Sequence, residues 1–588
     1  MPDLTRLLAA LALGAGLALA PVMANAQTGG EPQAEEETED GLASVSGLFL
    51  AARLAEADRN IPRAAEYYRR VLELQPDSPV FLQTTFLLEL ADGRMDGALQ
   101  LAERLVAGGD ANLARLLLGA RALKGRQHNE ALRQFEAFRG ESFGAALKAP
   151  LLAWAHAAGG NTDEALAVLD AAEGPPWLEI FTSYNAGLVN YLAGRFDAAV
   201  ERFARTYELD SRSLRTVQTY AAALDRVGLR EEARTVLEAY LAENPGQPSV
   251  LADLMLLDEE KPLAPPVLSP SAGAADVLNG LGAAIGRDGG EEVASIYLNL
   301  ALYLDPENVI ARIALGEIYE SLGLLERAAA VYEPVPDTSP FRRRVDIRLG
   351  IIYERLEKPD ETDAHMAGLI ETDPSDLDAI TVYGNILRIR EDYHGAIAVY
   401  TAGIGSLEQD QPQDWPLYYA RGIAYERTGQ WPLAEADFLK ALELSPEEPD
   451  VLNYLGYTWA DMGIHLDRAI GMLERAVELR PDSGYIIDSL GWVYYRLGRY
   501  DDALQLLERA VLIEPQQGEI QDHLGDVYWR VGRRLEARFQ WSHALEQVED
   551  AEDRAALETK LRDGLDDGPE PEAVQTQPEN APAAPVAQ

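Results

Sequence analysis

Residues Ser489–Pro515 read SLGWVYYRLGRYDDALQLLERAVLIEP, and this stretch decides the fold. Its first half has apolar residues at helical spacing and ends at Gly498, a residue that tolerates the left-handed backbone conformation common at helix ends. Asp501 and Asp502 then open a second apolar segment, because the positive end of the helix dipole favours carboxylates. Pro515 ends that segment. The stretch therefore predicts two antiparallel helices joined by a short turn.

The same pattern recurs along the chain with a period near 34 residues. Aligning the small residue of the first helix gives steps of 34, 34, 38, 34, 35 and 34 residues between Gly316, Gly350, Gly384, Gly422, Gly456, Gly491 and Gly525. The small residue of the second helix gives an independent register at Ala64, Ala98, Ala131, Ala165, Ala199, Ala233, Ala294, Ala328, Thr362, Ala396, Ala434, Ala469, Ala503 and Ala537. Small residues at both positions allow the two helix backbones to approach closely. Because one helix pair cannot bury its own apolar face, the pairs must stack on their neighbours.

With this period and this helix–turn–helix unit, the sequence resembles the tetratricopeptide repeat (TPR) family. The resemblance implies an all-α fold, an α-solenoid or superhelix of stacked helix pairs. We expect an N-terminal array of about six repeats at 42–258, a proline-rich linker and hinge at 259–274, and a C-terminal array of about eight repeats at 275–547. A polar helix at 548–563 is expected to cap the solenoid.

Both ends of the chain differ in composition from the repeats. Residues 1–26, MPDLTRLLAALALGAGLALAPVMANA, place an arginine before an apolar run and small residues before a cleavage point, which is typical of a secretory signal peptide. The alternative is an uncleaved membrane anchor, although the run Leu7–Ala20 is short for a bilayer span. Residues 27–41 and 564–588 are acidic and rich in Pro and Gly, so we expect them to be disordered. The sequence predicts export to a bacterial periplasm, with no membrane span after cleavage.

Charge and cysteine content exclude several classes of function. The 588-residue chain has 51 Lys and Arg against 97 Asp and Glu, which gives a net charge of −46. Binding to nucleic acid phosphates depends on cationic side chains, so nucleic acid is excluded as a partner of this surface. The absence of cysteine excludes disulfides, thiolate metal sites, cysteine nucleophiles and a lipid on an N-terminal cysteine.

One short stretch matches a catalytic pattern. Residues Gly140–Gly144 read GESFG, but the G-x-S-x-G motif works at a strand-to-helix turn and the surrounding pattern is helical. The glycines Gly280, Gly282 and Gly286 lack the spacing of a dinucleotide-binding loop. The seven histidines form no H-E-x-x-H motif and no paired metal spacing. The sequence therefore predicts that the protein is not an enzyme, with no catalytic residue, no metal site and no cofactor.

The family resemblance implies that first-helix residues flanking the glycine line a concave, protein-binding groove. In the last three repeats these residues are Asn453, Tyr454, Tyr457, Tyr485, Asp488, Trp492, Tyr495, Asp522, Asp526 and Trp529. On the same face lie Asn385 and Arg388, and, in the first array, Tyr184, Asn185 and Tyr191. The alternative is that several of these rings only pack between neighbouring helices. Because the set in the last three repeats contains aromatic, amide and carboxylate groups without a lysine, it favours a basic or neutral extended segment, or a protein with a cationic face.

Three segments carry a narrower resemblance: NYLGYTWADMG (Asn453–Gly463), DSLGWVYYRLG (Asp488–Gly498) and HLGDVYWRVG (His523–Gly532). They are similar to outer-membrane lipoprotein adaptors that bind a periplasmic carboxyl-terminal processing protease and deliver peptidoglycan hydrolases to it. This resemblance implies a non-catalytic scaffold or adaptor whose partners are a periplasmic serine protease and its substrates. The chain departs from those adaptors in lacking the lipidated cysteine. The alternative is an assembly factor for envelope machinery, for outer-membrane protein insertion or polysaccharide export, and the oligomeric state stays open.

Overall fold

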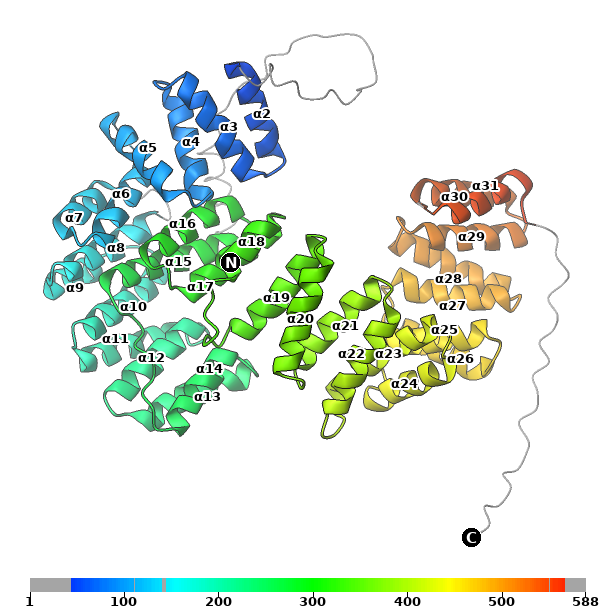
Figure 1. Ribbon diagram of the computed structural model, residues 1–588. Coiled ribbons are helices and arrows are strands. Elements are labelled where there is room, and N and C mark those ends of the chain that lie inside the picture. Colours follow the sequence, from blue (N-terminus) through cyan, green and yellow to red (C-terminus); the bar gives the residue numbers. More distant parts are fainter. Residues whose placement is uncertain (1–43, 110, 140–143, 549, 566–588) are drawn as a thin grey trace. The chain divides into compact units, whose positions relative to one another are not determined.

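The computed structural model describes four stretches of the chain (Figure 1): residues 44–109, 111–139, 144–548 and 550–565. Four parts of the sequence prediction fall outside them: the signal peptide at 1–26, the acidic segment at 27–41, most of the GESFG stretch at 140–143, and the tail beyond residue 565. The described residues form α-helices and one short 3-10 helix, with no strand among them. The predicted all-α solenoid is therefore confirmed.

The chain divides into two compact units, the first ending at Thr362 and the second beginning at Asp363. The helices of the first unit are α2 (Val45–Ala57), α3 (Ile61–Leu74), α4 (Pro79–Ala91), α5 (Met95–Ala107), α6 (Asn112–Lys124), α7 (His128–Ala137), α8 (Gly144–Ala158), α9 (Thr162–Asp170), α10 (Pro176–Leu192), α11 (Phe196–Leu209), α12 (Leu214–Arg226), α13 (Arg230–Glu243), α14 (Pro248–Asp258), α15 (Pro270–Arg287), α16 (Glu291–Leu304), α17 (Val309–Ser321), α18 (Leu325–Tyr332) and α19 (Arg342–Arg355). The division falls in the first turn of α20 (Pro359–Thr372). The helices of the second unit are α21 (Leu377–Ile389), α22 (Tyr393–Ser406), η2 (Pro412–Asp414), α23 (Trp415–Arg427), α24 (Trp431–Leu444), α25 (Pro449–Asp461), α26 (Leu466–Leu479), α27 (Gly484–Arg496), α28 (Tyr500–Ile513), α29 (Gly518–Arg530), α30 (Arg534–Gln547) and α31 (Ala551–Asp563).

Within each repeat, the two helices pack through the small residues that the sequence aligned. All fourteen positions of the second-helix column, including the single departure from alanine at Thr362, have no exposed surface. Bulky second-helix side chains lie directly over the first-helix glycines: a Cβ atom at Gly384 would lie 2.4 Å from the ring of Tyr400, and one at Gly525 would lie 2.4 Å from Trp541. Glycine is therefore needed at these two positions because a partner ring occupies the space of the missing side chain, and at Gly491 the side chain of Leu507 takes the same place.

The first unit fills its own concave side with later helices. In Figure 1, α15 and α16 lie inside the curve formed by the preceding pairs, and they pack on α4, α6 and α8. Gly273 in α15 meets the fully buried Trp154 of α8, where a Cβ atom would lie 2.2 Å from the indole ring. Trp154 Nε1 in turn donates to Asn185 Oδ1 at 2.9 Å. The apolar face of α15 is thus buried against a part of the chain more than a hundred residues away.

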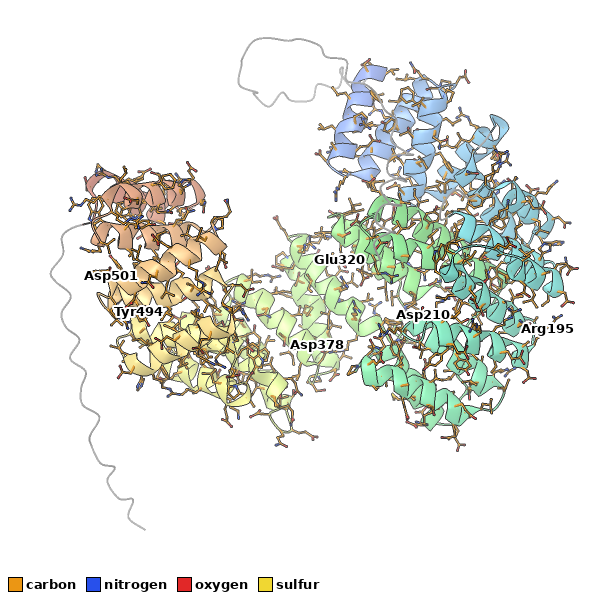
Figure 2. All side chains as sticks on the ribbon, turned by 180° about the vertical axis from the view of Figure 1, so that it is seen from behind. Arg195, Asp210, Glu320, Asp378, Tyr494 and Asp501 are labelled. Atoms are coloured by element: carbon orange, nitrogen blue, oxygen red, sulfur yellow. The ribbon has the colours of Figure 1, made fainter. Side chains whose placement is uncertain are left out.

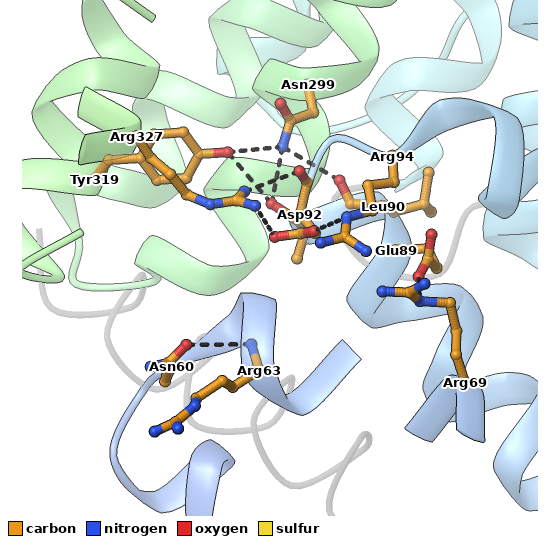
Figure 3. Close-up of polar contacts among 11 residues, drawn as sticks. Asn60, Arg63, Arg69, Glu89, Leu90, Asp92, Arg94, Asn299, Tyr319 and Arg327 are labelled. Atoms are coloured by element: carbon orange, nitrogen blue, oxygen red, sulfur yellow. Dashed lines mark hydrogen bonds and ion pairs between the residues drawn. The ribbon is translucent and has the colours of Figure 1, made fainter. Parts of the chain in front are cut away.

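A buried polar cluster closes this arrangement at the turn between α4 and α5 (Figure 3). Asn299 of α16 donates from Nδ2 to the carbonyl oxygen of Ala91 at 2.9 Å. Asp92, whose side chain has no exposed surface, forms ion pairs with Arg94 and with Arg327 of α18, each at 2.5 Å. Two cations offset the cost of burying this carboxylate, so α18 and the start of α5 are held together.

The structure differs from the predicted linker at 259–274. Residues 270–274 form the first turn of α15, and the preceding proline-rich segment is anchored rather than free. Leu263 and Val267 are buried, and the Leu263 amide donates to Asp225 Oδ2 at 2.9 Å. Because α15 and α16 then pack on the N-terminal pairs, the boundary between the compact units falls at 362–363 of the chain and not at the prolines.

The second unit is a regular array whose core is divided into smaller apolar clusters along the stack. The turn between α27 and α28 contains Gly498 at φ 75°, the left-handed conformation that the sequence predicts there. The last helix, α31, corresponds to the predicted capping segment at 548–563 and buries Leu557 against the final repeat.

Candidate protein-binding groove

Consecutive first helices of the second unit form a pocket of about 540 Å³, which we call the groove pocket. Its walls come from α23, α25, α27 and the start of α29, which follow one another as the first helices of successive repeats. The lining includes four of the predicted groove residues, Tyr454, Tyr457, Tyr485 and Asp488. It also includes residues that the sequence analysis did not select: Glu426, Arg427, Thr458, Asp461, Ser489, Glu514, Gln517, Glu519, Ile520 and His523.

Asp488 and His523 form the most buried polar pair of the groove pocket. Nδ1 of His523 lies 3.0 Å from both carboxylate oxygens of Asp488, and the two side chains are 13% and 8% exposed. The His523 ring stacks on Trp492, with centroids 3.9 Å apart and an interplanar angle of 16°. Burial by itself would lower the pKa of His523, but the charge and hydrogen bond of Asp488 outweigh it and raise that pKa. The pair therefore favours a protonated imidazole against an indole face.

Three tyrosines form the aromatic wall of the groove pocket. Tyr485 is 53% exposed, and the backbone amide of its neighbour Gly484 donates to Glu514 Oε1 at 2.8 Å, which holds the start of α27. Tyr454 donates from its hydroxyl to Glu426 Oε2 at 3.1 Å. Burial raises the pKa of Tyr457 to about 12, and the nearby carboxylates add to the shift, so the ring stays a neutral phenol.

Trp492, Tyr495 and Asn453 lie beside this wall. Trp492 stacks on Tyr495 with ring centroids 4.7 Å apart, and Arg530 donates from Nε to the Tyr495 hydroxyl at 3.4 Å. Asn453 is 1% exposed, and its Oδ1 atom has no hydrogen-bond partner in the described part of the chain. The predicted alternative of rings packing between helices therefore describes Trp492, whereas Tyr485 presents its ring to solvent.

The predicted groove residues of the last repeat are engaged by α31 and by Leu565, two residues after its end. Lys560 of α31 donates to Asp522 at 2.7 and 2.8 Å and to Asp526 at 2.9 Å. Trp529, 9% exposed, donates from Nε1 to the carbonyl oxygen of Leu565 at 3.1 Å. Asp522, Asp526 and Trp529 thus bind a segment of their own chain.

The remaining predicted positions lie outside the groove pocket. Asn385 on α21 accepts a hydrogen bond from the Tyr400 hydroxyl at 3.0 Å, and Arg388 lies one turn further along the same helix. In the first unit, Asn185 binds Trp154 as described above, and Tyr184 accepts from Arg215 Nε at 2.6 Å. Arg215 also pairs with Asp276 of α15. These two first-unit residues therefore help to hold α15 in place.

The sequence pattern could have predicted two of the pocket residues that were not among the predicted groove residues. Glu519 and His523 are four residues apart on α29, so they share a helix face next to Asp522, which was selected. Glu514 carried no such signal, because it ends the second helix of its repeat and reaches the pocket only through the antiparallel return of α28.

The described residues contain no group of three or more His, Asp or Glu side chains that could hold a metal ion. None of the helices in the described ranges is long and apolar enough to cross a membrane.

Two residues labelled in Figure 2 lie outside the lining of the groove pocket. Tyr494 of α27 donates to Glu474 Oε1 at 2.7 Å, and Asp501 of α28 is exposed. Asp501 therefore offers a carboxylate for comparison that does not line the groove pocket.

Comparison with known proteins gives three matches to tetratricopeptide repeat models, at residues 282–342, 415–448 and 465–559. A curated relative, TPR repeat-containing protein PA4667 of Pseudomonas aeruginosa, is 35% identical over 92 residues, and the match spans 16% of this chain and 16% of that protein. Among solved structures, the Cut9 and Hcn1 assembly of the APC/C is 16% identical with a TM-score of 0.36, covering 88% of this chain and 96% of that one. Yeast Tom70 is 13% identical with a TM-score of 0.29, covering 88% and 94%.

Proposed function

Since three segments of the chain match tetratricopeptide repeat models, we propose that it is a non-catalytic scaffold that binds partner proteins in the groove pocket of its second unit. The observation that carries the proposal is the groove pocket itself, which successive first helices of the second unit line with tyrosines and carboxylates. This pocket of about 540 Å³ has a half-exposed tyrosine, Tyr485, at its wall. The first unit also has a pocket, of about 790 Å³, but that one lies where α15 packs against α10 and α12, and its lining includes Tyr184 and Asp276, which hold α15 through Arg215. Tyrosine supplies a large contact area at low cost in side-chain entropy.

The finer part of the proposal concerns location and partners. We propose that residues 1–26 direct export and that the protein acts in the periplasm as an adaptor between a processing protease and its substrates, such as cell-wall hydrolases. Support comes from the signal-like composition of that segment and from the resemblance of Asn453–Gly463, Asp488–Gly498 and His523–Gly532 to such adaptors. Mass spectrometry of the exported protein should then find a chain that begins at Gln27.

Crosslinking in cells tests the groove pocket directly. A photo-crosslinking residue in place of Tyr485 is expected to capture partner proteins, because this side chain is 53% exposed at the pocket wall. Recovery of a serine protease together with a hydrolase supports the adaptor role. Recovery of an outer-membrane β-barrel or a polysaccharide synthase instead supports the envelope-assembly role.

A matched pair of substitutions separates the pocket from the rest of the surface. Tyr485→Ala is expected to reduce partner capture in pull-down experiments, whereas Phe539→Ala, which removes a 60% exposed ring from α30, should not. Circular dichroism checks that both variants keep their helical content. Equal capture by wild type and Tyr485→Ala would remove the groove pocket from the proposal.

A further inference from the structure

The concave face of the last three repeats carries an oxygen acceptor at one fixed repeat position. Three residues before the first-helix glycines Gly456, Gly491 and Gly525 stand Asn453, Asp488 and Asp522. All three are on first helices, α25, α27 and α29, so they follow one another along the same face of the array.

The last acceptor of this series holds a lysine. The Nζ atom of Lys560 lies 2.7 and 2.8 Å from the two oxygens of Asp522 and 2.9 Å from Asp526. Burial would lower the pKa of Lys560, but the two carboxylates outweigh it and raise that pKa, so the ammonium is charged. One turn earlier on α31, Leu557 is 2% exposed, so the docked face presents a Leu-x-x-Lys pattern.

The middle acceptor holds the imidazole of His523, which stacks on Trp492. The two occupied positions therefore share a chemistry, in which a carboxylate binds a nitrogen cation or a group that can become one. In the first case the cation is carried by α31, the helix that follows α30 at the end of the array.

The remaining acceptor, Asn453, lies next to the groove pocket, where its amide neighbours Tyr485. Its Oδ1 atom is buried without a hydrogen-bond partner in the described structure, which is costly unless a donor reaches it. The pocket is also strongly acidic: it is lined by one arginine, Arg427, and by five carboxylates, Glu426, Asp461, Asp488, Glu514 and Glu519. The tyrosine wall suits the methylene stem of a lysine, and the carboxylates suit its ammonium.

We propose that the groove pocket binds a lysine presented by an amphipathic helix of a partner protein, through the same pairing of carboxylates with an ammonium that Asp522 and Asp526 make with Lys560. This inference rests on the proposed function and names the chemistry of the partner at the same site. A helical partner segment with a Leu-x-x-Lys face fits the pocket, because its leucine contacts the tyrosine wall while its lysine reaches the carboxylates.

The test uses the full chain and two synthetic probes. One is a capped, alanine-rich helical peptide with two Leu-x-x-Lys units, and the other is the same peptide with each lysine replaced by glutamine. Fluorescence anisotropy of the labelled peptides is expected to show at least tenfold tighter binding of the lysine peptide. Comparable affinity of the two peptides would overturn the lysine assignment.

Variants separate the pocket from general attraction to a chain of net charge −46. Glu519→Gln, at an exposed position of the pocket, and Asp488→Asn are each expected to weaken binding of the lysine peptide about fivefold. Asp501→Asn removes an equal charge outside the pocket and should leave binding unchanged. Because Asp488→Asn also removes the partner of His523, Glu519→Gln keeps the test independent of folding. Equal weakening by Asp501→Asn would show general electrostatics and contradict the proposal.

The outcome also separates this inference from the proposed function. If Tyr485→Ala abolishes partner capture in cells while the two peptides bind alike, the groove pocket binds proteins without lysine selectivity, and only the present inference fails.

Discussion

At the residue scale, His523 links the charge state of the groove pocket to stability. Asp488, Glu519 and Asp522 all favour its protonated form and raise its pKa in the folded protein, although burial opposes them. Because the pKa is higher in the folded than in the unfolded chain, bound protons stabilise the fold. This stabilisation is complete below the ordinary histidine pKa of about 6.5 and is lost as pH rises through the raised value.

We therefore expect the free energy of unfolding of the second unit to fall as pH rises above about 6.5. Urea unfolding followed by tryptophan fluorescence measures it, because Trp492 stacks directly on His523. His523→Gln should flatten this dependence, whereas His394→Gln, at an exposed position of α22, should leave it. A profile unaffected by His523→Gln would contradict the role assigned to the pair.

A second residue-scale prediction concerns the packing register. Ala503 has no exposed surface, so Ala503→Leu should overpack the contact between α27 and α28 and lower the free energy of unfolding by about 1–3 kcal/mol. Gln505→Leu, on the exposed side of the same helix, is the matched control. Thermal unfolding followed by circular dichroism measures both, and an unchanged midpoint for Ala503→Leu would show that the register is wrong.

At the element scale, the position of α15 depends on a glycine. A Cβ atom at Gly273 would lie 2.2 Å from the Trp154 ring, whereas one at Gly280 in the same helix would meet its nearest neighbour, Phe181, at 3.7 Å. Gly273→Ala is therefore expected to destabilise the docking of α15 on α8 by about 1–3 kcal/mol, and Gly280→Ala should not. Hydrogen exchange along both helices measures this difference. Equal protection of α15 in the two variants would argue against the observed docking.

At the scale of the whole molecule, the two units differ in how their apolar cores are organised. The first has one large apolar cluster with members from Ile61 to Ile352, because α15 to α18 return to the N-terminal pairs, and a second, smaller cluster formed by α12 to α14. The second has several smaller clusters, as expected of an array in which each repeat contacts its neighbours. The first unit should therefore unfold cooperatively across elements that are far apart in the sequence.

The ion pair between Arg327 and Asp92 tests this cooperativity. Arg327→Ala leaves a carboxylate with no exposed surface short of one of its two cations, and we expect a loss of about 3–5 kcal/mol. Hydrogen exchange should rise in α4 and α5 as well as in α18, although more than 200 residues separate them. Arg344→Ala removes a 64% exposed arginine and should have little effect. Faster exchange confined to α18 would mean that the closing contact does not couple these elements.

Much of the groove was predictable, because its residues belong to the repeat pattern. Tyr454, Tyr457, Tyr485 and Asp488 lie at positions set by the register of their helices, and the structure brings them into one pocket. The rest depended on contacts between helices. Asp522, Asp526 and Trp529 have equivalent positions in the repeat, but α31 and its following residues engage them.

The sequence by itself determined the repeat architecture, because each repeat contains its own packing rule. A glycine under a bulky side chain, a buried small residue opposite it and a left-handed turn between them are local features, and the small residue is buried at all fourteen positions of its column. Only the tertiary structure decided that α15 and α16 fill the concave side of the first unit and that the division falls after Thr362. Contacts such as Gly273 with Trp154 join residues whose approach depends on the accumulated curvature of many repeats, which no single repeat encodes.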